Sequence, residues 1–154
     1  MYPIFKTERV ILKPFNEDDA ENVFELICAF KLQNEGDHFT DINTLDDAKR
    51  INNETIKAGN ELIIIDNKTL NPIGWVVCDK ALGHKLNKRT FIHTWIRNEY
   101  RHVGLGREIL EKMMNFSFYG IQTENVVTNV KNSDKKAYQL MLNLGFEIYN
   151  HFPK

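Results

Sequence analysis

The stretch Arg101-His102-Val103-Gly104-Leu105-Gly106 decides the fold, because it joins two segments of different hydrophobic pattern. An apolar, strand-like run precedes it at residues 91–96, and apolar residues at helical spacing follow it through residue 119. Glycines at 104 and 106 permit backbone angles and close approaches that a Cβ would block, so several amides can point at one anion. A helix starting there adds unpaired amides and the positive end of its dipole. Alone, the stretch fits a phosphate-binding turn or a simple strand-to-helix connection.

Outward from this turn, strand-like and helical patterns alternate. Asn16 with Asp19, and Thr44 with Asp47, resemble helix N-caps before apolar residues at helical spacing, and Gly59 is placed to end the second helix. We expect strands near residues 8–13, 61–66, 73–79, 89–97, 125–130 and 146–151. The last helix should end at residue 145. The order βααβββαβαβ predicts an α/β fold, a mixed, mostly antiparallel sheet flanked by helices.

Length and composition fit a soluble globular domain. The chain has 154 residues, of which 42% are hydrophobic and 27% charged, and we expect residues 1–154 to form a single domain. No apolar run approaches the ~20 residues of a membrane span, and the first residues lack the apolar core of a signal peptide. We therefore expect a cytoplasmic protein without a membrane partner. Two distant cysteines, Cys28 and Cys78, favour buried thiols, and the histidine spacing predicts no metal site.

The net charge of −1 hides a division between the halves. Residues 1–79 carry 15 acidic and 8 basic residues, a net of −7, whereas residues 80–154 carry 6 acidic and 12 basic residues, a net of +6. Acidic residues are densest at 16–47, which fits either a solvated helix surface or a funnel for a cationic substrate. The bases near the glycine turn suit a polyanionic ligand. They are dispersed along the sequence, so we expect no nucleic-acid partner.

Three segments together resemble one family. Residues 98–106, between a strand and an amphipathic helix, look like the acetyl-CoA site of the GNAT superfamily of N-acetyltransferases, with the motif Q/R-x-x-G-x-G/A. Residues 7–15, followed by 18–20, are similar to the start of the branch that includes ribosomal-protein N-terminal acetyltransferases and spermidine acetyltransferases. Residues 130–137, closing with Leu144-Gly145-Phe146, are similar to the V-x-x-x-N-x-x-A/S to GF segment. The resemblance covers nearly the whole chain and implies one N-acetyltransferase domain.

The resemblance also implies a cosubstrate, acetyl-CoA, and direct attack of a primary amine on its thioester in a ternary complex. The turn amides would hold the pyrophosphate, and main-chain groups of the preceding strand would hold the pantetheine arm. An amide near Ile96 would stabilise the oxyanion. Asp134 stands where the family usually has asparagine, with Asn132 and Ser133 close by. The cofactor-binding residues so implied are Trp95, Ile96, Arg97, Arg101, His102, Val103, Gly104, Leu105, Gly106, Arg107, Asn132 and Asp134.

The proton-transfer groups depart from the family pattern. Phe91 occupies the position of the branch's frequent glutamate, and His93, two residues on and on the same strand face, is the nearest titratable substitute. Met141 and Ala137 occupy the positions of the family's tyrosine and of its serine or alanine. Tyr138, one helical turn before Met141, is the candidate to protonate the leaving thiolate. A structural histidine and a buried structural tyrosine are the competing interpretations of these candidates.

Three functions stay open from the sequence: an N-acetyltransferase, a coenzyme A-binding module with little or no transferase activity, and a phosphate-binding protein of another α/β fold. The third lacks G-x-x-x-x-G-K-[ST]. For the first, the acceptor would be cationic: a small-molecule amine such as a polyamine or amino sugar, or a protein or peptide N-terminus. The family usually has another strand after the one that begins at Phe146, yet this sequence stops at Lys154. Either the sheet edge is capped differently or a second subunit covers it, which makes a homodimer a hypothesis.

Overall fold

The computed structural model describes residues 2–33, 36–80, 89–131 and 133–148. Its six-stranded sheet has the order β1-β2-β3-β4-β5-β6, with antiparallel neighbours except for the parallel pair β5 and β6. The strands are β1 (Phe5–Lys6), β2 (Val10–Pro14), β3 (Glu61–Asp66), β4 (Pro72–Asp79), β5 (Arg89–Ile96) and β6 (Asn125–Val127). The helices are α1 (Ala20–Leu32), α2 (Leu45–Ala58), α3 (Leu105–Asn115) and α4 (Lys135–Asn143). This architecture confirms the predicted α/β fold with a mixed sheet.

Short polar sequences set the ends of the N-terminal helices. Asn16 caps a 3-10 turn (Glu17–Asp19) that leads into α1, and Thr44 caps α2; each forms a capping box with an aspartate three residues on. Gly59 ends α2 in the left-handed conformation, with φ of 66°. The sequence predicted all three signals, because each depends on neighbours within four residues.

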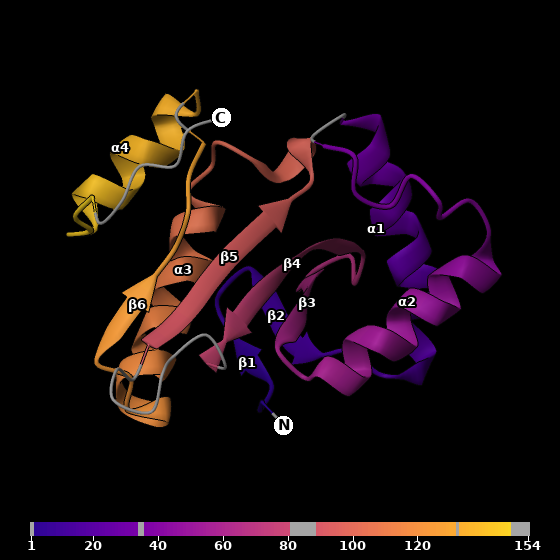
Figure 1. The fold of residues 1–154 in the computed structure, drawn as a ribbon, viewed down its shortest axis with the longest axis horizontal. Coiled ribbons are helices and arrows are strands. Elements are labelled where there is room, and N and C mark those ends of the chain that lie inside the picture. The colour runs from indigo at the N-terminus through magenta and orange to yellow at the C-terminus, as the bar shows by residue number, and fades with distance from the viewer. Residues whose placement is uncertain (1, 34–35, 81–88, 132, 149–154) are drawn as a thin grey trace.

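Two hydrophobic layers cover the two sheet faces. On one face α3 packs through Leu105, Ile109 and Met113 against the inward side chains of β2 to β5. On the other, Leu26 and Phe30 of α1 pack on β3 and β5, and α2 packs mainly against α1. Figure 1 shows α1 and α2 together at one side of the molecule, and α4 beyond β6 at the opposite side. The sheet therefore separates the first two helices from α3.

Three boundaries differ from the sequence-based prediction. The strand expected at residues 125–130 is only Asn125–Val127, and α3 passes into a π-helical segment, Phe116–Ile121, in place of a regular helix to residue 119. Residues 146–148 of the expected last strand are irregular chain, and the rest of that prediction lies outside the described residues. A short strand that was not predicted, β1, precedes β2. Cys28, expected to be buried, is exposed, whereas Cys78 is buried.

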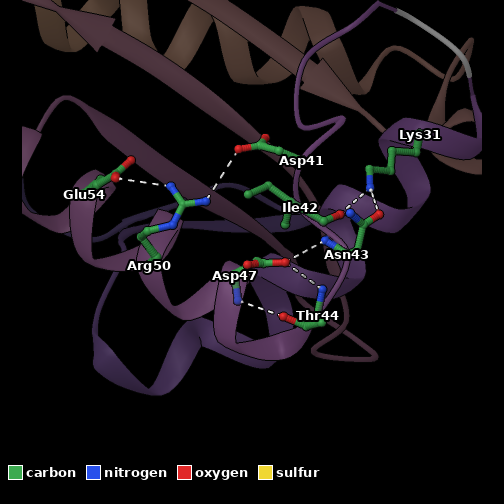
Figure 2. A network of polar contacts seen from close by, with 8 residues as sticks. All are labelled: Lys31, Asp41, Ile42, Asn43, Thr44, Asp47, Arg50 and Glu54. Atoms are coloured by element: carbon green, nitrogen blue, oxygen red, sulfur yellow. Dashed lines mark hydrogen bonds and ion pairs between the residues drawn. The ribbon is translucent and has the colours of Figure 1, made fainter.

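Several acidic residues of the N-terminal half have structural partners. Figure 2 shows Asp47 accepting from the main-chain N–H groups of Asn43 and Thr44, and Arg50 between Asp41 and Glu54. Their ion-pair distances are 3.6 Å and 3.5 Å. These contacts fix the described segment before α2, and they assign part of the acidic cluster to helix capping and surface ion pairs.

Candidate active site

The glycine turn lies between β5 and α3, as the sequence predicted. A 3-10 turn, Asn98–Tyr100, leads into it, and His102 and Gly104 both have positive φ values, 65° and 82°. Gly104 is the N-cap of α3 and has no side-chain capping bond, and the first bond of this helix runs from Glu108 N–H to Gly104 C=O at 3.1 Å. The first amides of α3 therefore have no intrahelical acceptor, which is the arrangement of an anion site at a helix N-terminus.

Gly106 is not required by the packing of the protein itself. Among the described residues, the nearest atom to a Cβ at this position would be Ile96 Cδ1, at 3.9 Å, which is ordinary van der Waals contact. Gly104 differs, because its φ of 82° is strained for other residues. The space beside Gly106 would admit a group that approaches the backbone closely. The turn therefore fits a diphosphate.

In the part of the chain that the structure describes, the edge of β5 that faces β6 is unpaired along its second half. Within the described chain, β6 pairs with β5 only through Arg89↔Asn125, Thr90↔Val126 and Phe91↔Val127. In Figure 1 the chain beyond β6 runs on toward α4. Main-chain groups on this open edge can bind an extended ligand as an added strand would.

Hydrogen bonds show which peptide groups face the open edge. The N–H of Arg97 donates to Ile73 C=O at 2.9 Å, and its C=O accepts from Tyr100 N–H at 3.0 Å. Because peptide groups alternate along an antiparallel strand, Trp95 also faces β4, whereas Thr94 and Ile96 face the gap beside β6. The main-chain groups of Trp95 and Arg97 thus pair within the protein, whereas those of Thr94 and Ile96 face the open gap.

A close approach of backbone at Gly74 supports this orientation. A Cβ at Gly74 would lie 2.0 Å from the carbonyl oxygen of Trp95, so this oxygen points at β4. The indole of Trp95 lies 5% exposed and stacks on Trp75 with ring centroids 4.6 Å apart. The side chain of Trp95 thus belongs to the aromatic core under α1.

Arg101, the first residue of the motif, folds back on β5. Its Nε donates to the Ile96 carbonyl oxygen at 2.7 Å. This bond occupies the carbonyl of Ile96 and leaves its N–H as the donor directed into the gap. The other turn residues differ in exposure: Val103 is 60% exposed, whereas Leu105 is 4% exposed and packs in the core.

His93 lies on the sheet face opposite α3, beside Phe91. The two rings stack with centroids 6.3 Å apart and an interplanar angle of 10°. Although His93 retains exposed surface, desolvation by the surrounding chain lowers its pKa below the ordinary value near 6.5. The imidazole is therefore neutral at pH 7 and able to accept a proton.

Glu61 is a candidate that the sequence reasoning missed. In the register of the sheet, Val77 pairs with Glu61 on one side and with His93 on the other, so all three side chains share one face. Burial raises the pKa of Glu61 above its ordinary value. Two inter-strand spacings separate Glu61 from His93, about 10 Å. A glutamate at the start of the otherwise apolar strand ELIIID was the available signal, but its neighbour could not be known without the register.

Of the C-terminal candidates, Tyr138 lies on α4, which Figure 1 shows beyond β6. Tyr138 is 38% exposed, which contradicts a fully buried structural tyrosine, while Met141 packs against the core. Asp134 Oδ1 accepts from Ala137 N–H at 3.0 Å and caps α4. Asn132 lies outside the described residues.

A hollow of about 250 Å³ lies at the end of α1, next to the loop after β5. Its lining includes Gln33 and Arg97, and Gln33 Oε1 accepts from Asn98 N–H at 2.8 Å. Arg97 forms two ion pairs, with 3.6 Å between its Nη1 and Glu25 Oε1 and 3.0 Å between its Nε and Glu99 Oε1. These contacts join α1 to the chain that enters the glycine turn.

Two kinds of site are not seen in the part of the chain that the structure describes. No helix there combines the length and hydropathy needed to cross a bilayer. Nor do any three His, Cys, Asp or Glu side chains of those residues gather as a metal site would require.

An α/β fold with a glycine turn after a half-open strand has the features with which proteins bind an extended, phosphate-bearing ligand. A family model described as the acetyltransferase (GNAT) domain matches residues 9–147. The chain therefore belongs to the GNAT acetyltransferase family, whose members are acetyl-CoA-dependent N-acetyltransferases, and this confirms the resemblance described above. No curated protein sequence was found to match it.

Solved structures of other acetyltransferases share the fold. A ribosomal-protein-S5-alanine acetyltransferase from Vibrio fischeri has a TM-score of 0.82 at 13% identity, covering 95% of this chain and 84% of its own. A spermidine N-acetyltransferase mutant from Vibrio cholerae has a TM-score of 0.72 at 17% identity, with coverages of 94% and 83%. A microcin self-immunity acetyltransferase, in complex with acetyl-CoA and AMP, has a TM-score of 0.69 at 17% identity, with coverages of 91% and 79%.

Proposed function

We propose that this protein transfers the acetyl group of acetyl-CoA to a primary amine by direct attack within a ternary complex. The observation that carries the proposal is the turn itself: α3 begins without a side-chain cap, and the missing Cβ of Gly106 leaves space beside its first amides. These amides, at Leu105, Gly106 and Arg107, would hold the diphosphate. Acetyl-CoA, when bound, supplies the acetyl thioester.

The open edge of β5 would align the pantetheine arm. Thr94 offers an N–H and a C=O to the gap, and Ile96 offers its N–H because Arg101 occupies its carbonyl. An N–H fixed in this position would also stabilise negative charge that develops on the acetyl oxygen. Holding two reactants in place can supply ~7 to 11 kcal/mol of the barrier, so the residues need not do extensive covalent chemistry.

His93 would accept the proton of the attacking amine. Its lowered pKa keeps it neutral near pH 7, and it shares a sheet face with Glu61, whose carboxylate would attract a cationic acceptor. Tyr138 would donate a proton to the departing sulfur from the exposed side of α4. Acceptors that suit this face are peptide N-termini, polyamines and amino sugars.

Thiol release from acetyl-CoA, measured with a panel of these amines, tests the proposal. We expect amine-dependent release and saturable coenzyme A binding. Coenzyme A binding without transfer to any amine would favour a binding module. That alternative is motivated by Phe91, Ala137 and Met141, which occupy the family's usual catalytic positions. Neither binding nor transfer would contradict both functions.

A further inference from the structure

The N-terminal segment is attached to the glycine turn by one arginine. Arg9, which directly precedes β2, lies 94 residues before Val103 in the sequence, yet its Nη1 donates to the Val103 carbonyl oxygen at 2.9 Å. Its Nε donates to Glu108 Oε1 at 3.0 Å. The same guanidinium therefore binds both the turn and the first part of α3.

The guanidinium also lies directly beside the glycine that starts α3. A Cβ at Gly104 would lie 3.8 Å from Arg9 Nη2. The side chains of Arg9 and Glu108 are 41% and 25% exposed, so water only partly screens the pair. Thr7 completes the arrangement, because its hydroxyl donates to the second carboxylate oxygen, Oε2, of Glu108.

Glu108 presents an electrostatic conflict that these contacts resolve. It is an acidic residue in the first turn of the helix whose N-terminal amides would hold a diphosphate. A free carboxylate there would repel that ligand. Although partial burial raises the pKa of Glu108, hydrogen bonds from Thr7 and Arg9 outweigh it and lower the pKa overall, so the carboxylate is ionised and neutralised by Arg9.

The bond to Val103 acts on the shape of the turn. A main-chain carbonyl oxygen that faced the ligand would repel phosphate oxygens, whereas the neighbouring N–H groups attract them. Arg9 holds this oxygen in a charge-assisted hydrogen bond, between the two positive-φ residues, His102 and Gly104. The turn is therefore fixed from outside the motif.

We propose that Arg9 is a positioning residue for the diphosphate-binding turn, which orients Val103 and cancels the charge of Glu108. This inference rests on the proposed function. It assigns a role in cosubstrate binding to the segment before β2, which the glycine motif does not include.

Calorimetric titration of the full-length protein with coenzyme A and with dephospho-coenzyme A tests this role. We compare wild type with Arg9→Gln, Glu108→Gln, the double variant, and Arg50→Gln, a matched control on α2 that also forms an exposed ion pair with a glutamate. Arg9→Gln should raise the Kd for both ligands about tenfold, and KM for acetyl-CoA should rise with little change in kcat. The double variant should recover part of this loss, because it removes the unpaired carboxylate.

Four outcomes would count against the inference. If Arg9→Gln bound coenzyme A as tightly as wild type and Arg50→Gln do, the inference would be overturned. The proposed function would still stand, because the wild-type protein would bind coenzyme A. A loss with coenzyme A but not with dephospho-coenzyme A would transfer the contact to the 3′-phosphate. A lower Tm of Arg9→Gln, together with a higher KM for the amine acceptor as well as for acetyl-CoA, would indicate general destabilisation. Wild type that binds neither ligand would instead contradict the proposed function itself.

Discussion

The N–H of Arg97 donates to the carbonyl oxygen of Ile73 at 2.9 Å, and this bond sets the direction of the peptide groups along β5. It turns the N–H of Ile96 to the opposite edge, where β6 no longer pairs. Arg101 then occupies the Ile96 carbonyl. The N–H of Ile96, like that of Thr94, therefore points from the strand into the gap that adjoins the glycine turn.

Gly106→Ala should separate ligand binding from folding. The added methyl group has space in the free protein, with Ile96 Cδ1 at 3.9 Å, and alanine is the better helix former. We expect the free energy of unfolding to stay the same or rise by up to ~1 kcal/mol, while the Kd for coenzyme A rises at least about tenfold. Calorimetry and urea denaturation measure the two quantities. Unchanged affinity would show that nothing approaches the backbone at this position, and Asn53→Ala on exposed α2 is the control.

Gly74→Ala, unlike Gly106→Ala, should lower the free energy of unfolding. Its Cβ would lie 2.0 Å from the Trp95 carbonyl oxygen, and a backbone atom cannot move without displacing β5. We expect a loss of at least ~1 to 3 kcal/mol in the free energy of unfolding. Gly120→Ala offers a comparison, because its Cβ would meet the ring of Phe116 at 2.7 Å and a side chain can shift. If Gly74→Ala cost no more than Gly120→Ala by urea denaturation, the close approach of β4 and β5 would be wrong.

Part of the fold and of the candidate site could be predicted from the sequence, and part could not. Helix caps at Thr44 and Gly59 and the turn at Gly104 were predicted, because their signals are local. The open edge of β5 was implied only through the family resemblance. The orientation of Ile96, and the proximity of Arg9 to Val103, depend on strand register and on contacts between residues nearly a hundred positions apart, which no local pattern encodes.

Protonation of His93 should lower kcat/KM at acidic pH, which gives the pH–rate profile an acid limb. Desolvation lowers its pKa below about 6.5, so the folded protein binds this proton less readily than the unfolded chain. Stability from this residue is therefore complete above pH 6.5 and decreases as pH falls below that value. We expect kcat/KM to fall with an apparent pKa below 6.5, and His93→Gln to lower kcat ~10²-fold or more and to remove this limb. An unchanged pH profile in His93→Gln would exclude it as the base.

Glu61→Gln should affect the amine and not the cosubstrate. The carboxylate shares a sheet face with His93 across Val77, away from the glycine turn. We expect KM for a cationic acceptor to rise roughly tenfold, with KM for acetyl-CoA unchanged. Glu54→Gln, an exposed residue of α2 paired with Arg50, is the matched control. Equal effects of the two substitutions in steady-state kinetics would remove Glu61 from the acceptor site.

Tyr138→Phe tests the proton donor on α4. Because Tyr138 is 38% exposed, removal of its hydroxyl should leave the free energy of unfolding within about 0.5 kcal/mol of wild type. We expect kcat to fall at least about 10²-fold with acetyl-CoA as donor, and less with an acetyl thioester of a more acidic thiol. The same fall with both donors would show that the hydroxyl does not act on the departing sulfur.

Calorimetric titration of the intact protein with acetyl-CoA tests the central claim, that the amides at the start of α3 bind a diphosphate. Saturable binding with a stoichiometry near one is the predicted result, with the affinity lost in Gly106→Ala while its fold is retained. Absence of saturable heat in the wild type, or full affinity in Gly106→Ala, would contradict it.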